Sequence, residues 1–147
     1  MKLLKATFLL ASAIFFSQGV QAQTVANADA VGSVKASPAY TEVMVRSIEL
    51  RSELEAVLLD YREESPKVRA LRREIAILDD AMEMLMGLPL GSSGKMTSAV
   101  GRLIVRRAAL ETEYSETVAR YGDDHPEVRR AKKRVEVYER SIRELLK

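Results

Sequence analysis

Hydrophobic residues recur at alternating steps of three and four along two stretches of the chain, 39–86 and 99–146. This spacing places them on one stripe of an α-helix, whereas a half-buried strand would alternate with a period of two. The pattern therefore predicts an all-α fold with four long helices and heptad-type contacts. The stripe positions in the first stretch are Tyr40, Val43, Ser47, Leu50, Leu54, Val57 and Tyr61, then Val68, Leu71, Ile75, Leu78, Met82 and Leu85. Those in the second are Val100, Leu103, Arg107, Leu110, Tyr114, Thr117 and Tyr121, then Val128, Ala131, Val135, Tyr138, Ile142 and Leu145.

The two stretches form an internal repeat. A shift of sixty residues aligns them without a gap, and apolar character matches at most stripe positions. Identical pairs include Val45/Val105, Leu50/Leu110, Tyr61/Tyr121, Pro66/Pro126 and Arg69/Arg129. We therefore predict two tandem antiparallel helical hairpins, over 39–86 and 99–147.

A turn motif stands in the middle of each repeat, YREESPKV at 61–68 and YGDDHPEV at 121–128. Proline suits the first position of a helix, and it pushes the preceding residue out of the α region. We expect four-residue bends at 62–65 and 122–125, with the tyrosine closing the stripe at each bend and Gly122 in a left-handed cap. Ser65 is a favourable N-cap and His125 a poorer one. The residues assigned to the turns are Tyr61, Ser65, Pro66, Val68, Tyr121, Gly122, His125, Pro126 and Val128.

A second apolar set widens the apolar face of the first helix in each repeat. It consists of Met44, Ile48 and Leu58 in the first repeat, and of Ile104, Ala108 and Val118 in the second. A single heptad stripe buries too little surface for an isolated hairpin to be more than marginally stable. The net charges of the two stretches have opposite signs, which also favours packing between them. Residues 39–86 carry 7 basic and 11 acidic residues, and residues 99–146 carry 11 basic and 9 acidic residues. We expect the hairpins to pack on each other or on a second chain, and we expect a homo-oligomer.

The segments outside the repeats have distinct compositions. Residues 1–22 combine early lysines, an apolar run of eleven and small residues before Gln23, which is typical of a secretory signal peptide cleaved near Ala22. Residues 23–38 read as a flexible leader, and 87–98 as a Gly/Ser linker. The expected destination is the periplasm or the exterior, and no stretch is long and apolar enough for an integral membrane protein.

Composition narrows the function classes. Removing residues 1–22 takes away Lys2 and Lys5, so the formal charge falls from +2 to 0 and gives no reason to expect an anionic partner. The chain has no cysteine, which excludes disulfides and thiol chemistry. No constellation of catalytic groups is visible, and we predict neither an enzyme nor a cofactor.

Two groups of polar residues could bind a ligand. His125 with Asp123 and Asp124 could begin a metal site, but three adjacent turn residues rarely converge on one ion, so we assign a turn-and-cap role and no metal. A basic cluster follows, and it could meet an anionic envelope glycan or lipid head group; the alternative, which we favour, is a solvated face with intrahelical ion pairs. Nucleic acid is not expected, because no aromatic residue is interleaved for stacking. The cluster consists of Arg129, Arg130, Lys132, Lys133 and Arg134.

Polar residues interrupt the stripe at one position of the repeat, Ser47 and Arg107. Such a residue either sets the register of the paired helices or lies at a solvent-open end of the stripe.

The turn motif, written YGDDHPEVRRAKKRV in the second copy, resembles a segment of the periplasmic helical hairpins of polysaccharide chain-length determinant and exopolysaccharide export proteins. The first copy departs from it with Ser65 in place of histidine and Lys67 in place of glutamate. The resemblance implies a shared hairpin geometry and a cell-envelope partner, and it implies no active site.

Two functional hypotheses follow. The first is a non-enzymatic, exported coiled-coil protein that acts by protein–protein association in the cell envelope, as an accessory to polysaccharide export. The alternative is a periplasmic holdase-type chaperone, in which the hairpin prongs and the Met-rich tract at Met82, Met84 and Met86 grip unfolded clients.

Overall fold

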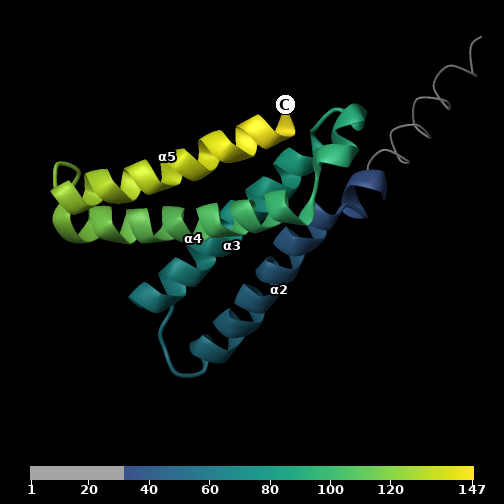
Figure 1. Cartoon of the computed structure of the whole chain (residues 1–147). Coiled ribbons are helices and arrows are strands. Elements are labelled where there is room, and N and C mark those ends of the chain that lie inside the picture. Colours follow the sequence, from purple (N-terminus) through teal and green to yellow (C-terminus); the bar gives the residue numbers. More distant parts are fainter. Residues whose placement is uncertain (1–31) are drawn as a thin grey trace, which may run out of the picture.

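The fold is all-α, and it is built from two tandem antiparallel hairpins of two long helices each. The computed structural model describes residues 32–147, apart from the side chain of Leu90, and no strand occurs in that range. Hairpin 1 consists of α2 (Pro38–Leu58) and α3 (Pro66–Met86), and hairpin 2 of α4 (Ser98–Tyr121) and α5 (Pro126–Leu146). The expected signal peptide at 1–22 lies outside the described residues. Figure 1 shows the hairpins side by side near the segment that connects α3 to α4, and diverging toward their bends.

The helices begin where the sequence places caps and prolines. Proline is the first residue of α2, α3 and α5, and each N-cap residue has an extended backbone. Ser65 Oγ accepts a hydrogen bond from the Val68 backbone N–H at 3.2 Å, which satisfies one free donor of the first turn. At the same position of the repeat, His125 Nδ1 accepts from the Glu127 N–H at 3.2 Å. Val68 and Val128 follow as buried residues, at 0% and 3% exposure.

The two bends differ in length. The bend of hairpin 2 spans 122–125 as predicted, because Gly122 adopts a φ of 80° and ends α4 abruptly. Hairpin 1 has Arg62 at this position, where a side chain disfavours positive φ, and α2 already ends at Leu58. Its chain unwinds through hydrogen bonds from the N–H groups of Leu59 to Ala56 and of Asp60 to Val57. The four-residue bend expected at 62–65 is therefore wrong for hairpin 1.

The tyrosines of the turn motif do not close a buried stripe. Tyr61 and Tyr121 remain 52% and 49% exposed at the ends of the hairpins. The Tyr121 ring instead stacks on the His125 ring, with centroids 4.4 Å apart. The other stripe positions are buried or partly buried, except Leu145.

The segments next to the hairpins close the shared end of the core. Val34 is 3% exposed and Ser37 caps α2 through the Tyr40 N–H, so the expected flexible leader at 23–38 is packed at its end. The expected linker at 87–98 contains a 3-10 helix, η1 (Leu90–Lys95), and ends at the buried Met96. The Met96 carbonyl accepts the Ala39 N–H at 3.1 Å. These contacts join the two hairpins at the end opposite the bends.

The hairpins pack on each other through α4, which lies against both α2 and α3. Ile104 and Ala108 of the second apolar set face hairpin 1 and are 2% and 0% exposed. Gly101 allows the closest approach: a Cβ built there would lie 2.7 Å from Glu42 Cβ and 2.8 Å from the Ala39 carbonyl oxygen. Helix α5 contacts α4 and η1. Of the two partners that the sequence allowed for the second apolar set, the other hairpin and a second chain, hairpin 2 uses the other hairpin of the same chain.

Candidate functional site

The outward face of α2 carries a row of uncharged, exposed side chains. Met44 and Ile48 are 37% and 57% exposed, and Thr41 and Ser52 continue the row by one turn at either end. The spacing of three and four residues puts all four on one face of the helix. We call this row the outer α2 stripe: Thr41, Met44, Ile48 and Ser52. Val45, which is 47% exposed, lies beside it.

The outer α2 stripe can be compared with the equivalent residues of the second repeat. Met44 and Ile48 correspond to Ile104 and Ala108 after the sixty-residue shift. In hairpin 2 these positions are buried against another hairpin, while in hairpin 1 they face outward. The sequence predicted that both sets would accept a helix pair, and within the described chain only the second set has one.

Polar interactions hold the helices of each hairpin in register. Ser47 is 2% exposed and its Oγ lies 3.3 Å from Asp79 Oδ1, while Arg107 Nε lies 3.8 Å from Glu139 Oε1. Asp79 and Glu139 are themselves repeat equivalents, so both hairpins join the same two positions. Exposed ion pairs contribute little free energy of folding. Because both contacts join the same two positions of the repeat, they favour the interpretation that Ser47 and Arg107 set the register of the paired helices.

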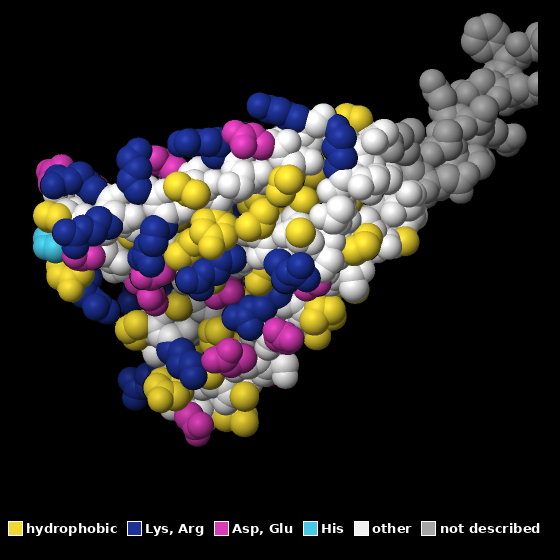
Figure 2. Space-filling view, viewed as in Figure 1, with side chains coloured by type: hydrophobic (Ala, Val, Ile, Leu, Met, Phe, Trp, Pro, Cys, Tyr) yellow, Lys and Arg dark blue, Asp and Glu magenta, His cyan; other side chains and the backbone are white. Residues whose placement is uncertain are grey.

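The basic cluster at the start of α5 is largely paired. Glutamates bind Arg130, Lys133 and Arg134, and the Arg129 guanidinium donates to the Asp124 carbonyl at 2.9 Å. The Lys133 ammonium also lowers the pKa of Glu136 through a hydrogen bond of 2.6 Å. Figure 2 shows acidic and basic side chains interspersed over the visible face of both hairpins. This arrangement is that of a solvated face with ion pairs, and it leaves Arg129 and Lys132 without an ion pair in the described chain.

The remaining polar residues of the turn are Asp123, Asp124 and His125. No group of three or more carboxylate or imidazole side chains within residues 32–147 could hold a metal ion. His125 is engaged by the Glu127 N–H and the Tyr121 ring. None of the helices in the described range combines the length and the apolar content of a membrane span.

Of the Met-rich tract, only Met84 is clearly exposed, at 41%. Met82 and Met86 pack against the core. The tract therefore offers a partner one side chain, whereas the outer α2 stripe and Val45 offer three apolar side chains within five residues.

Comparison with protein-family models, with curated proteins and with solved structures finds no significant match to this chain.

Proposed function

We propose that this protein is a non-enzymatic association module of the cell envelope, that it pairs with a second copy of itself through the outer α2 stripe, and that it serves polysaccharide export. The signal-peptide pattern of residues 1–22 supports the location, and the resemblance of the turn motif supports the pathway. The observation that carries the association is the exposure of Met44, Val45 and Ile48 in the middle of a 21-residue helix.

The repeat supports a helical hairpin as the occupant of the stripe. The equivalent residues of α4 already pack against a hairpin of this chain, so a surface of this kind is suited to helix packing. Burying Met44 and Ile48 fully would gain about 1–3 kcal/mol per side chain before the cost of association.

A second copy fits because the stripe carries no charge. Two α2 helices can meet across a twofold axis at Met44 and Ile48 without opposing like charges, since Thr41 and Ser52 are neutral. Arg51, which borders the stripe, is already paired with Asp79 at 2.6 Å. An isologous contact therefore buries apolar surface and leaves the ion pairs of hairpin 1 intact.

Replacing Ile48 with Glu should convert a dimer into a monomer. Sedimentation equilibrium on the chain from Gln23 measures the mass, and circular dichroism checks that the helix content is unchanged, because Ile48 is 57% exposed and outside the core. Val137→Glu is the matched control, since Val137 is 55% exposed on α5. It should leave the dimer in place.

A monomeric wild-type chain at every concentration tested would contradict self-association. Equal dissociation by Ile48→Glu and Val137→Glu would contradict the placement of the contact on α2.

The ends of the hairpins favour a second candidate, the holdase-type chaperone. Leu59 is 86% exposed at the bend of hairpin 1, and Tyr61 and Tyr121 are about half exposed. These side chains form exposed apolar surfaces at the ends of the two hairpins, where an unfolded segment would bind. Aggregation assays with an unfolded test protein at stoichiometric ratio examine this alternative, and Leu59→Ser should weaken any protection. Absence of protection by the wild-type chain would eliminate it.

A further inference from the structure

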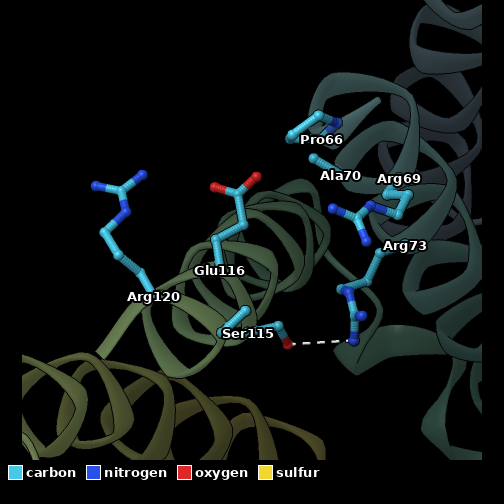
Figure 3. Close-up of a pocket in the computed structure, with 8 residues that line it drawn as sticks. Pro66, Arg69, Ala70, Arg73, Ser115, Glu116 and Arg120 are labelled. Carbon is cyan, nitrogen blue, oxygen red and sulfur yellow. Dashed lines mark hydrogen bonds between the residues drawn. The ribbon is translucent and has the colours of Figure 1, made fainter. Parts of the chain in front are cut away.

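A cleft opens between α3 and α4 where the two hairpins diverge. It has a volume of about 290 Å³ and is lined by Pro66, Arg69, Ala70 and Arg73 of α3, and by Ser115, Glu116, Ala119 and Arg120 of α4. Figure 3 shows the Glu116 carboxylate between the side chains of Arg120 and Arg69, and the Arg73 guanidinium beside Ser115. The small residues Ala70 and Ala119 leave the space between the helices open.

Three guanidinium groups line this cleft without an ion pair. Within residues 32–147, Arg69, Arg73 and Arg120 contact no carboxylate closely enough to form one. The Arg73 guanidinium donates to Ser115 Oγ at 3.3 Å, and the Arg120 guanidinium lies 5.9 Å from the centre of the Tyr121 ring. By contrast, the arginines that bridge α2 to α3 are paired, Arg46 with Glu74 and Arg51 with Asp79.

The repeat shows that this basic surface is built differently in the two hairpins. The α3 side of the cleft corresponds, sixty residues on, to a shallow depression lined by Pro126, Arg129, Arg130 and Lys133. There Glu127 pairs with Arg130 and Glu136 with Lys133. The residue equivalent to Glu127 is Lys67, and the one equivalent to Glu136 is Ala76. Ala70 replaces Arg130 in hairpin 1, so Arg73 is the cleft residue that loses an acidic neighbour relative to its counterpart, Lys133, and Arg120 adds a third cation from hairpin 2.

We propose that this cleft is a binding site for a phosphate group in its dianionic form. Its lining carries three positive charges and one negative charge, so a dianion balances it. Guanidinium groups match phosphate oxygens in a two-point geometry, and arginine is the preferred residue for such recognition. The volume lies at the small end of ligand pockets and suits a compact anion or the terminal phosphate of a larger molecule. The proposal does not depend on the outer α2 stripe, which lies on another helix.

The cleft is open to solvent, so the affinity should be modest and should fall steeply with salt. Isothermal titration of the chain from Gln23 with pyrophosphate measures the free phosphate source at low ionic strength. Flotation with vesicles of phosphatidylcholine containing phosphatidic acid measures the lipid source. The double variant Arg69→Gln/Arg73→Gln should bind about tenfold more weakly to whichever source binds the wild type.

Two further variants separate a site from general electrostatics. Arg129→Gln/Lys133→Gln makes the same charge change sixty residues on, and it should alter binding by less than about twofold. Glu116→Gln removes the one carboxylate of the cleft and should tighten binding about threefold. The side chains of the α3 variants are exposed, so thermal unfolding should confirm that the fold is unchanged.

The proposal is overturned if neither pyrophosphate nor the phosphatidic acid vesicles bind saturably. It is also overturned if the two double variants weaken binding equally, or if Glu116→Gln leaves binding unchanged.

Discussion

Replacing Gly101 with Ala should destabilise the protein by about 1–3 kcal/mol, although alanine is the better helix former by about 1 kcal/mol. Gly101 lies inside α4, where intrinsic propensity alone predicts a gain. The new Cβ would meet Glu42 Cβ at 2.7 Å, and it would approach the backbone of Ala39 at 2.8–3.0 Å. Backbone atoms cannot rotate away, so α2 and α4 must separate. The sign of the effect therefore reports whether the two hairpins touch here.

Gly87→Ala is the matched control for this experiment. Gly87 ends α3 with an ordinary φ of −81°, and the contacts of an added Cβ begin at 3.6 Å. This substitution should be neutral or slightly stabilising. Urea unfolding followed by circular dichroism gives both values. A stabilising Gly101→Ala would show that α2 and α4 do not approach as described.

Truncating Ile104 to Ala should cost about 2–5 kcal/mol, whereas truncating Met44 to Ala should cost less than about 1 kcal/mol. The two residues occupy the same position of the repeat, but Ile104 is 2% exposed between the hairpins and Met44 is 37% exposed. The Ile104 change leaves a cavity that the packed helices fill only partly.

These two variants are best compared in the Ile48→Glu background, because dimerisation would add a concentration-dependent term to the stability of the Met44 variant. Denaturant titration then gives the free energy of unfolding of the single chain. Equal losses for Ile104→Ala and Met44→Ala would mean that α4 and α2 are equally covered, contrary to the asymmetric packing of the hairpins.

The sequence was sufficient to predict the helices and the repeat. The heptad spacing predicts the helices, and Pro66 and Pro126 predict where α3 and α5 begin, since a proline at the first helical position acts locally. The register contacts of Ser47 and Arg107 could also be anticipated from the polar positions they occupy.

The sequence did not reveal how the hairpins pack. An apolar face such as Met44 and Ile48 shows which side of a helix can be covered, but not which partner covers it. The role of Gly101 depends on α2, a helix of the other repeat. Val34 and Met96 are buried because they pack against the core formed by the two hairpins, which the sequence pattern does not show. The length of the first bend follows from Arg62 at the position of Gly122, a difference visible in the alignment of the repeats.

The cleft that contains Arg69, Arg73 and Arg120 was not predicted from the sequence, for a similar reason. The cluster at 129–134 stands out in the sequence because its charges are consecutive, yet most of them pair with nearby glutamates. Arg69, Arg73 and Arg120 are scattered over fifty residues, and the divergence of the hairpins brings them to one cleft. Aligning the repeats would have indicated Arg73, because its counterpart Lys133 pairs with Glu136 and the counterpart of Glu136 is Ala76.

The proposed contact of two copies at the outer α2 stripe predicts a short distance between spin labels placed on that face. The chain has no cysteine, so Ser52→Cys introduces a single labelling site one turn from Ile48 on the same face. Pulsed electron double resonance should give one defined, short intermolecular distance, because a twofold contact on the stripe brings the two labels close together. That signal should vanish on dilution with unlabelled chain and in the Ile48→Glu background. A labelled protein that shows no intermolecular coupling, or coupling that survives Ile48→Glu, would mean that two copies do not meet at the outer α2 stripe.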